Sequence, residues 1–84
     1  MALWHLEWDK QAYADLSHLV SDDYPAARTV IALAVAAAED PDTVGAHPVT
    51  STDLYSATRD GWFIVFHLAT HFDVLRVVGF GRTA

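Results

Sequence analysis

The sequence predicts an α+β fold with the element order β-α-α-β-β-β, in which two helices cover one face of a small antiparallel sheet. Residues 3–8 alternate between two sets of side chains, as a strand with one buried face does. Apolar residues at helical spacing follow in residues 9–40, and three strand-like runs follow residue 53. Residues 1–84 are therefore expected to form one domain.

Two helices are expected between Asp9 and Pro41. Asp9 is placed to cap the first, because its carboxylate can accept hydrogen bonds from the free amides of the first turn. That helix carries an apolar stripe made of Ala12, Tyr13, Leu16, Leu19 and Val20. Pro25 fits the first turn of the second helix, and Asp40-Pro41 ends it. The alanine-rich segment between them has little polar surface, so this helix is expected to be buried on most sides.

The second half of the chain predicts strands at residues 54–58, 62–68 and 72–80. Asp60-Gly61 is typical of a type I′ hairpin turn, whose two central residues need positive φ. A second short turn is expected at Ala69-Thr70. Most aromatic side chains are expected in the core, namely Trp4, Trp8, Tyr13, Trp62, Phe66 and Phe72. The sheet face opposite the helices is expected to be partly open.

Composition excludes several classes of protein. With 52% hydrophobic and 19% charged residues, the chain is too apolar to be disordered. It has no cysteine, so neither a disulfide framework nor a thiolate metal site is available. The longest apolar run, residues 30–38, is far shorter than the roughly 20 residues that cross a bilayer, and the N-terminus lacks a basic leader. A cytoplasmic protein without a membrane partner is expected.

Charge is distributed unevenly along the chain. Residues 1–52 hold eight acidic and two basic side chains, a balance of −6, whereas residues 53–84 hold three of each. The total of −6 argues against broad, charge-driven binding of nucleic acid. If the protein meets RNA or DNA, the neutral second half is the expected contact.

Several short motifs follow one another along the whole chain. The first segment, Trp4–Ala12, contains a strand that runs into the motif W-x-x-x-A, and the second, Ala38–Pro41, contains the D-P that closes the second helix. The remaining segments lie before and within the predicted strands: His47–Thr50, Asp53–Tyr55, Gly61–Phe66 and Val77–Gly79. In this order they resemble the RelE/ParE superfamily of toxins from bacterial type II toxin–antitoxin systems. The resemblance implies a RelE-like toxin that inhibits growth through ribosome-associated mRNA cleavage, as an mRNA interferase, and a cognate antitoxin that binds it.

The chain departs from the family where catalysis depends on basic residues. The basic positions of the second strand fall at Ser56 and Thr58, and the arginine of the third strand falls at Phe63. Only Arg82 stands near a family arginine, displaced by one residue, and the family's C-terminal tyrosine has no counterpart. Enzymatic activity is therefore an open question, and a nuclease site would have to be rebuilt from other residues.

Three residues are the candidate catalytic groups: Arg82, Arg59 and His67. Arg82 lies next to two glycines that let a phosphate approach the backbone, and His67 can act as a general acid or base near neutral pH. A nucleic-acid or partner face is expected from Ser56, Thr58, Phe63, Arg76 and Phe80. No cofactor is implied, and no metal either, because a turn separates His67 from His71.

Each candidate also has an ordinary structural interpretation. Arg82 could be a tail arginine, Arg59 a solvated turn residue and Arg76 one half of a surface ion pair. His67 could be a plain surface histidine, and Ser56 and Thr58 simply the polar positions of an exposed strand.

Two further functions are alternatives to ribosome-associated mRNA cleavage. A ParE-like inhibitor of DNA gyrase would not need the nuclease residues. A degenerate toxin would act only as an antitoxin-binding module, through a shared apolar face made of Phe63, Val65, Leu75 and Val77.

Overall fold

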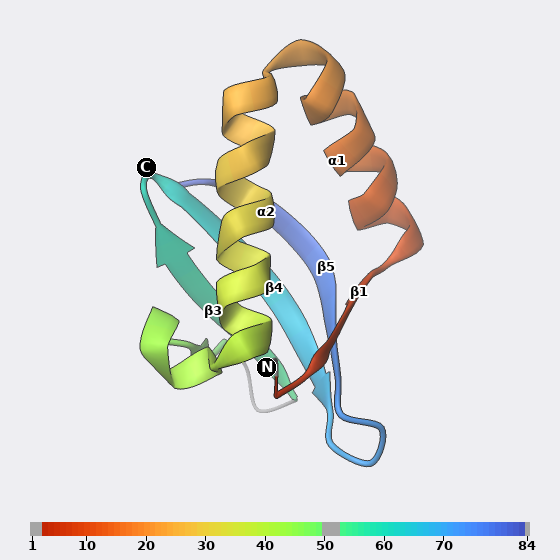
Figure 1. The fold of residues 1–84 in the computed structure, drawn as a ribbon, viewed down its shortest axis with the longest axis vertical. Helices are drawn as coiled ribbons and strands as arrows, with labels where there is room; N and C mark the ends of the chain where they lie inside the picture. The colour runs from red at the N-terminus through yellow and green to blue at the C-terminus, as the bar shows by residue number, and fades with distance from the viewer. Residues whose placement is uncertain (1–2, 50–52, 84) are drawn as a thin grey trace.

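The computed structural model describes residues 3–49 and 53–83. Two helices lie side by side over one face of a five-stranded sheet (Figure 1). The elements are β1 (His5–Trp8), α1 (Lys10–Asp22), α2 (Tyr24–Glu39), the 3₁₀ turn η1 (Pro41–Val44), β2 (His47–Pro48), β3 (Leu54–Arg59), β4 (Trp62–Ala69) and β5 (Val74–Arg82). The predicted α+β architecture is confirmed, with η1 and the short β2 as additions.

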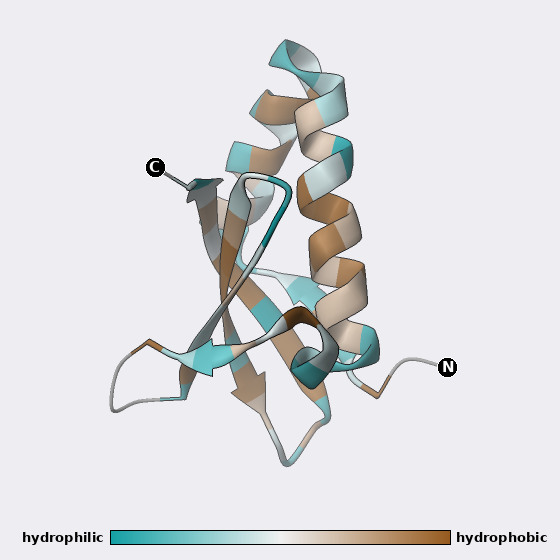
Figure 2. Ribbon diagram, turned by 90° about the vertical axis from the view of Figure 1, so that its left-hand side faces the viewer, coloured by the Kyte–Doolittle hydropathy of each residue, from teal (hydrophilic) through white to brown (hydrophobic). Residues whose placement is uncertain are grey.

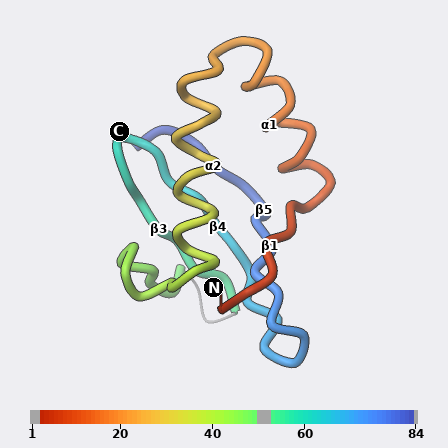
Figure 3. The backbone as a smooth tube through the Cα atoms, viewed as in Figure 1, coloured from red at the N-terminus to blue at the C-terminus, as the bar shows by residue number. Residues whose placement is uncertain are grey.

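The sheet is mixed rather than purely antiparallel. Its strand order is β1-β5-β4-β3-β2, and β1 runs parallel to β5 while every other pair is antiparallel. The helical hairpin between β1 and the rest of the sheet carries the chain back to the end where it began, as the tube in Figure 3 shows. A helical crossover of this kind is what allows the first strand to lie parallel to the last.

A side-chain hydrogen bond caps the N-terminus of the second helix, α2, but not that of the first helix, α1. The Asp23 carboxylate accepts a hydrogen bond from the Ala26 amide at 3.2 Å, with Pro25 in the first turn. Asp9 occupies the position before α1, but its side chain makes no capping hydrogen bond. The prediction of a carboxylate cap at Asp9 is wrong; its backbone carbonyl accepts from the Tyr13 amide instead.

The first predicted hairpin turn is confirmed and the second is wrong. Asp60 and Gly61 have φ values of 53° and 84°, as a type I′ turn needs. The β4–β5 connection spans residues 70–73, where Asp73 also has positive φ, instead of the expected Ala69-Thr70 turn. Phe72 consequently lies in this turn, 76% exposed, and not in the core.

The core lies between α2 and the central strands, where Figure 2 shows the apolar residues concentrating. Its largest fully buried side chains are Phe66, Leu33, Ile64, Leu75, Val30 and Val77. Trp62 is buried, and Trp4 and Trp8 pack against the cluster, as predicted. Tyr13 is exposed, because it follows buried Ala12 by one residue and so points about 100° away from it around the helix. The outer side of α2 is exposed as well, contrary to the prediction.

A β-bulge changes which residues of β5 face the helices. Phe66 lies opposite Val77, but its neighbour Val65 lies opposite Gly79, so Val78 is an extra residue in β5. Beyond this point the alternation is inverted, and Phe80 lies opposite Ile64 and packs against the core. The prediction that Phe80 belongs to the open face is therefore wrong.

The expected shared apolar face is also wrong. Leu75 and Val77 are fully buried beneath the helices, whereas Phe63 and Val65 are half-buried on the opposite face of the sheet. The register explains the difference, because Leu75 lies opposite Leu68 and Val77 lies opposite the core residue Phe66.

Candidate functional site

The sheet face that the helices leave uncovered, called the open face below, is crossed by a row of four side chains that are all ionisable except Leu54. Leu54, His67, Arg76 and Glu7 lie opposite one another across β3, β4, β5 and β1. The His67 Nε2 atom lies 3.8 Å from Asp53 Oδ2, and the Arg76 guanidinium donates to Glu7 Oε1 at 3.2 Å. Each cationic or potentially cationic side chain in this row thus has a carboxylate beside it.

A second part of the open face carries no charge and combines hydroxyl side chains with apolar ones. Thr58 lies opposite Phe63, and Ser56 lies opposite Val65. The ring of Phe63 lies over Gly81, where an added Cβ would stand 2.9 Å from the ring carbons. Gly81 therefore leaves the space that lets Phe63 lie flat on the strand. The predicted partner-face residues Ser56, Thr58, Phe63 and Arg76 do share this face with His67.

Arg82 and Arg59 lie on the other face, at the end of the sheet near the helical hairpin. The Arg82 guanidinium lies 4.6 Å from the centre of the Trp62 ring, and its Nη2 atom is 3.7 Å from Asp23 Oδ2. Arg59 and Arg82 both lie opposite Trp62, whose side chain is buried beneath the helices. The structure therefore does not bring the three predicted catalytic residues together: His67 is on the open face and the two arginines are not.

The bulge is the physical reason for the position of Arg82. Strict alternation from Arg76 would place Arg82 on the open face, and the extra residue Val78 turns it to the helix side. Simple alternation cannot reveal such a residue, although Gly79 and Gly81 so close together are a weak indication of an irregular strand.

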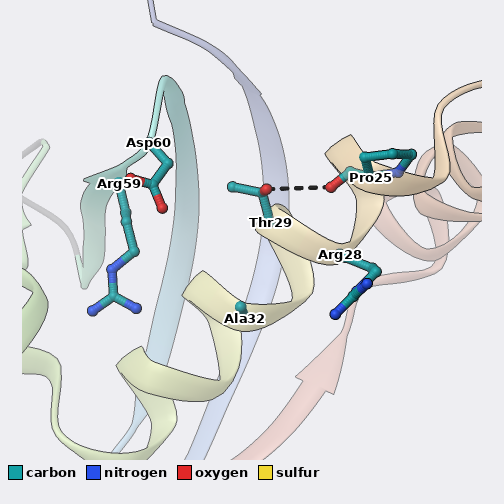
Figure 4. Close-up of a pocket in the computed structure, with 6 residues that line it drawn as sticks. All are labelled: Pro25, Arg28, Thr29, Ala32, Arg59 and Asp60. Atoms are coloured by element: carbon teal, nitrogen blue, oxygen red, sulfur yellow. Dashed lines mark hydrogen bonds between the residues drawn. The ribbon is translucent and has the colours of Figure 1, made fainter.

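A cleft opens between α2 and the β3–β4 turn on the helix side. Its volume is about 400 Å³, and its walls are Pro25, Arg28, Thr29 and Ala32 from α2 with Arg59 and Asp60 from the turn (Figure 4). Arg28 is not among the candidate residues that the sequence predicts, because it is far from the other arginines along the chain. Only the packing of α2 on the sheet brings it to Arg59.

Other kinds of site find little support in residues 3–49 and 53–83. Every buried side chain in these residues is apolar, and they hold no group of three or more histidine, aspartate or glutamate residues able to bind a metal ion. Within the same residues, neither α1 nor α2 is long and apolar enough to cross a bilayer.

Comparison with known proteins identifies the fold. No protein-family model matches the sequence, and no curated protein matches it either. A chain of the toxin–antitoxin complex RelBE2 from Mycobacterium tuberculosis superposes with a TM-score of 0.82 at 16% identity, covering 100% of this chain and 95% of that one. The isolated Escherichia coli RelE toxin has a TM-score of 0.77 at 17% identity, covering 96% of this chain and 85% of that one.

A third structure is similar over nearly its whole length. It is the conserved hypothetical protein HP0892 from Helicobacter pylori, with a TM-score of 0.61 at 20% identity, covering 94% of this chain and 93% of that one. The chain thus has the fold of RelE, and the resemblance inferred from its motifs is confirmed at the level of the fold.

Proposed function

We propose that the chain is the toxin component of a type II toxin–antitoxin module, that it acts in the cytoplasm, and that a cognate antitoxin binds it. The observation that carries this proposal is the likeness of the whole fold to the isolated RelE toxin and to a chain of a toxin–antitoxin complex. Fold likeness alone does not define an activity, so the activity is argued from the side chains of the open face.

The open face suits RNA cleavage through His67. In cleavage by the ribose 2′-hydroxyl, the 2′-oxygen bonds to phosphorus, giving a 2′,3′-cyclic phosphate, and the bond to the 5′-oxygen of the next nucleotide breaks. A base must take the 2′-hydroxyl proton, and its protonated form can give that proton to the leaving 5′-oxygen; imidazole exchanges protons near neutral pH and can do both. The His67 side chain is 41% exposed, so RNA can reach it, and the Asp53 carboxylate lies 3.8 Å from its Nε2 atom. Ser56, on the neighbouring strand, offers a hydroxyl for hydrogen bonding to a phosphate.

Arg76 is the one arginine available to stabilise a developing phosphate charge on this face. It lies directly opposite His67 in the β4–β5 ladder, so both side chains can reach one bound nucleotide. In the free protein its guanidinium is bonded to Glu7 at 3.2 Å. A phosphate must compete with that carboxylate, which would make the protein a weak nuclease.

Replacing Glu7 by glutamine is therefore expected to raise cleavage about two- to fivefold, because a half-exposed ion pair of this kind is worth at most about 1 kcal/mol. The substitution keeps the shape of the side chain and removes the charge that competes with phosphate. The measurement is the rate of message cleavage on purified ribosomes, with Asp15→Asn on the exposed side of α1 as the control for lost negative charge. Unchanged or slower cleavage in Glu7→Gln would remove Arg76 from the mechanism.

A second candidate, a toxin that binds its target without cleaving it, rests on the same ion pairs. Both Arg76 and His67 have carboxylate partners, and Phe63, Val65 and Val78 provide partly exposed apolar surface, which is typical of a protein-binding face. A toxin that inhibits DNA gyrase gains no support from the solved structures of similar fold, because the structure named as an isolated toxin is that of RelE. Mapping of message ends separates the two candidates.

The proposal of a toxin is tested by inducing the chain in a bacterial host and following growth. Arrest of growth on induction is the expected result. Continued growth of cells that contain soluble, folded chain would reject the proposal.

A further inference from the structure

We propose that the cleft between α2 and the β3–β4 turn is a docking site for an acidic segment of a partner protein. We call it the arginine cleft; its walls are Arg28 and Arg59 with Pro25, Thr29, Ala32 and Asp60. This inference does not depend on the proposed toxin function, since it concerns the face of the molecule away from His67.

The pairing of the four arginines distinguishes this cleft from the rest of the surface. Arg76 and Arg82 each have a carboxylate within 4.0 Å, Glu7 and Asp23 respectively. Arg28 and Arg59 have no carboxylate within that distance among residues 3–49 and 53–83, although the chain carries a net charge of −6. The two arginines without such a partner line the same cleft. Within the part of the chain that the structure describes, these two charges are thus without a carboxylate partner.

The cleft presents one arginine from each of its two walls, Arg28 from α2 and Arg59 from the β3–β4 turn. Figure 4 shows the two guanidinium groups on opposite sides of the cleft, with the small side chain of Ala32 between them in this view. The Thr29 hydroxyl donates to the Pro25 carbonyl at 3.2 Å, so its proton is already engaged within the helix. Guanidinium groups bind carboxylates through paired hydrogen bonds, so a segment that crosses the cleft can pair one carboxylate with each arginine.

An apolar stripe beside the cleft indicates that the ligand has apolar side chains too. Tyr24, Ile31 and Val35 lie on one side of α2 at helical spacing and are 59%, 36% and 42% exposed. Arg28 stands between this stripe and the cleft on the helix surface. A segment with a carboxylate next to apolar residues would bury the stripe and pair with the arginines together.

Charge favours an acidic protein segment over nucleic acid. Asp60 lines the cleft, and the first half of the chain carries the whole excess of −6, so a long polyanion would be repelled beyond the cleft itself. A short segment with one or two carboxylates avoids that repulsion. The same negative field would favour a partner whose remaining surface is basic.

The probe is a short fluorescent peptide with leucines at helical spacing and adjacent glutamates, compared with the same peptide carrying glutamine in place of glutamate. The glutamate peptide is expected to bind the full chain, and Arg28→Gln and Arg59→Gln are each expected to weaken it about tenfold, the effect of losing one charge-assisted pair. Lys10→Gln, an exposed cation on α1, is the matched control and is expected to bind as the wild type does. Circular dichroism confirms that each variant is folded.

Three results would overturn the inference. The first is equal binding of the glutamate and glutamine peptides, or no binding of either. The second is a single-stranded RNA of similar charge that binds in preference to the peptide and depends on Arg28 and Arg59. The third is dimerisation of the chain that Arg28→Gln abolishes, in analytical ultracentrifugation, since the occupant would then be a second copy.

Discussion

Replacing Phe66 by alanine is expected to lower the free energy of unfolding by roughly 3–5 kcal/mol, the cost of removing a phenyl ring from a closed core. Phe66 is fully buried in the middle of β4, and its ring stacks on Tyr55 with the ring centres 6.0 Å apart. A small domain has a total stability of only about 5–15 kcal/mol, so much of it depends on this side chain. Urea unfolding followed by circular dichroism measures the difference.

Phe63→Ala is the matched control, because Phe63 has the same side chain on the same strand but lies half-buried on the open face. Removal of the Phe63 ring is expected to lower the free energy of unfolding by clearly less, about 1–2 kcal/mol, since less apolar surface returns to water. Equal losses in the two variants would mean that the helices do not define the buried face of β4.

Deletion of Val78 is expected to be as damaging, although the side chain itself is partly exposed. Without the extra residue, the end of β5 returns to strict alternation, and every side chain after Val77 changes face. Phe80 would leave its place beside Trp62, and Arg82 would leave both Trp62 and Asp23. The expected loss is about 3 kcal/mol or more, comparable to the removal of an aromatic core residue.

Val78→Ala separates the role of the residue from that of its side chain. It keeps the bulge and is expected to cost less than about 1 kcal/mol, because a single, partly exposed valine loses little on truncation. Equal stability of the deletion and Val78→Ala in urea unfolding would show that the bulge does not fix the position of Phe80.

The elements that could be predicted from sequence are those with a local cause. Asp60-Gly61 specifies its turn because both residues tolerate positive φ, and Pro25 and Asp40-Pro41 mark the two ends of α2 because proline lacks an amide donor. The alternation in β4 correctly separates buried Ile64 and Phe66 from half-buried Val65. Each of these signals is contained in a few neighbouring residues.

The features that could not be predicted depend on contacts between distant segments. The bulge at Val78 depends on how β5 is paired with β4, and strict alternation hides it. Arg28 and Arg59 are 31 positions apart in the chain and share a cleft only after α2 packs on the sheet. Arg82 was assigned to the same site as His67 from motif spacing, and its partners Trp62 and Asp23 lie on the other face.

The separation of the basic residues has a functional consequence. Arg82 lies over the Trp62 ring at the helix-covered end of the sheet, and Arg59 lines the arginine cleft, whereas the open face has His67 and Arg76. An RNA-cleaving toxin built on this chain would therefore depend on His67 and be insensitive to removal of the Arg82 side chain, apart from effects on folding.

The most direct test maps the 5′ ends of a translated reporter message after induction of the wild type, His67→Gln and Arg82→Gln in a bacterial host. Cleavage confined to the translated region is expected for the wild type and Arg82→Gln. It is expected to fall about 100-fold or more in folded His67→Gln, the range for loss of a general base. Cleavage of equal strength in His67→Gln would contradict the assignment of the open face as a nuclease site, and growth arrest without any cleavage would support the binding-only toxin.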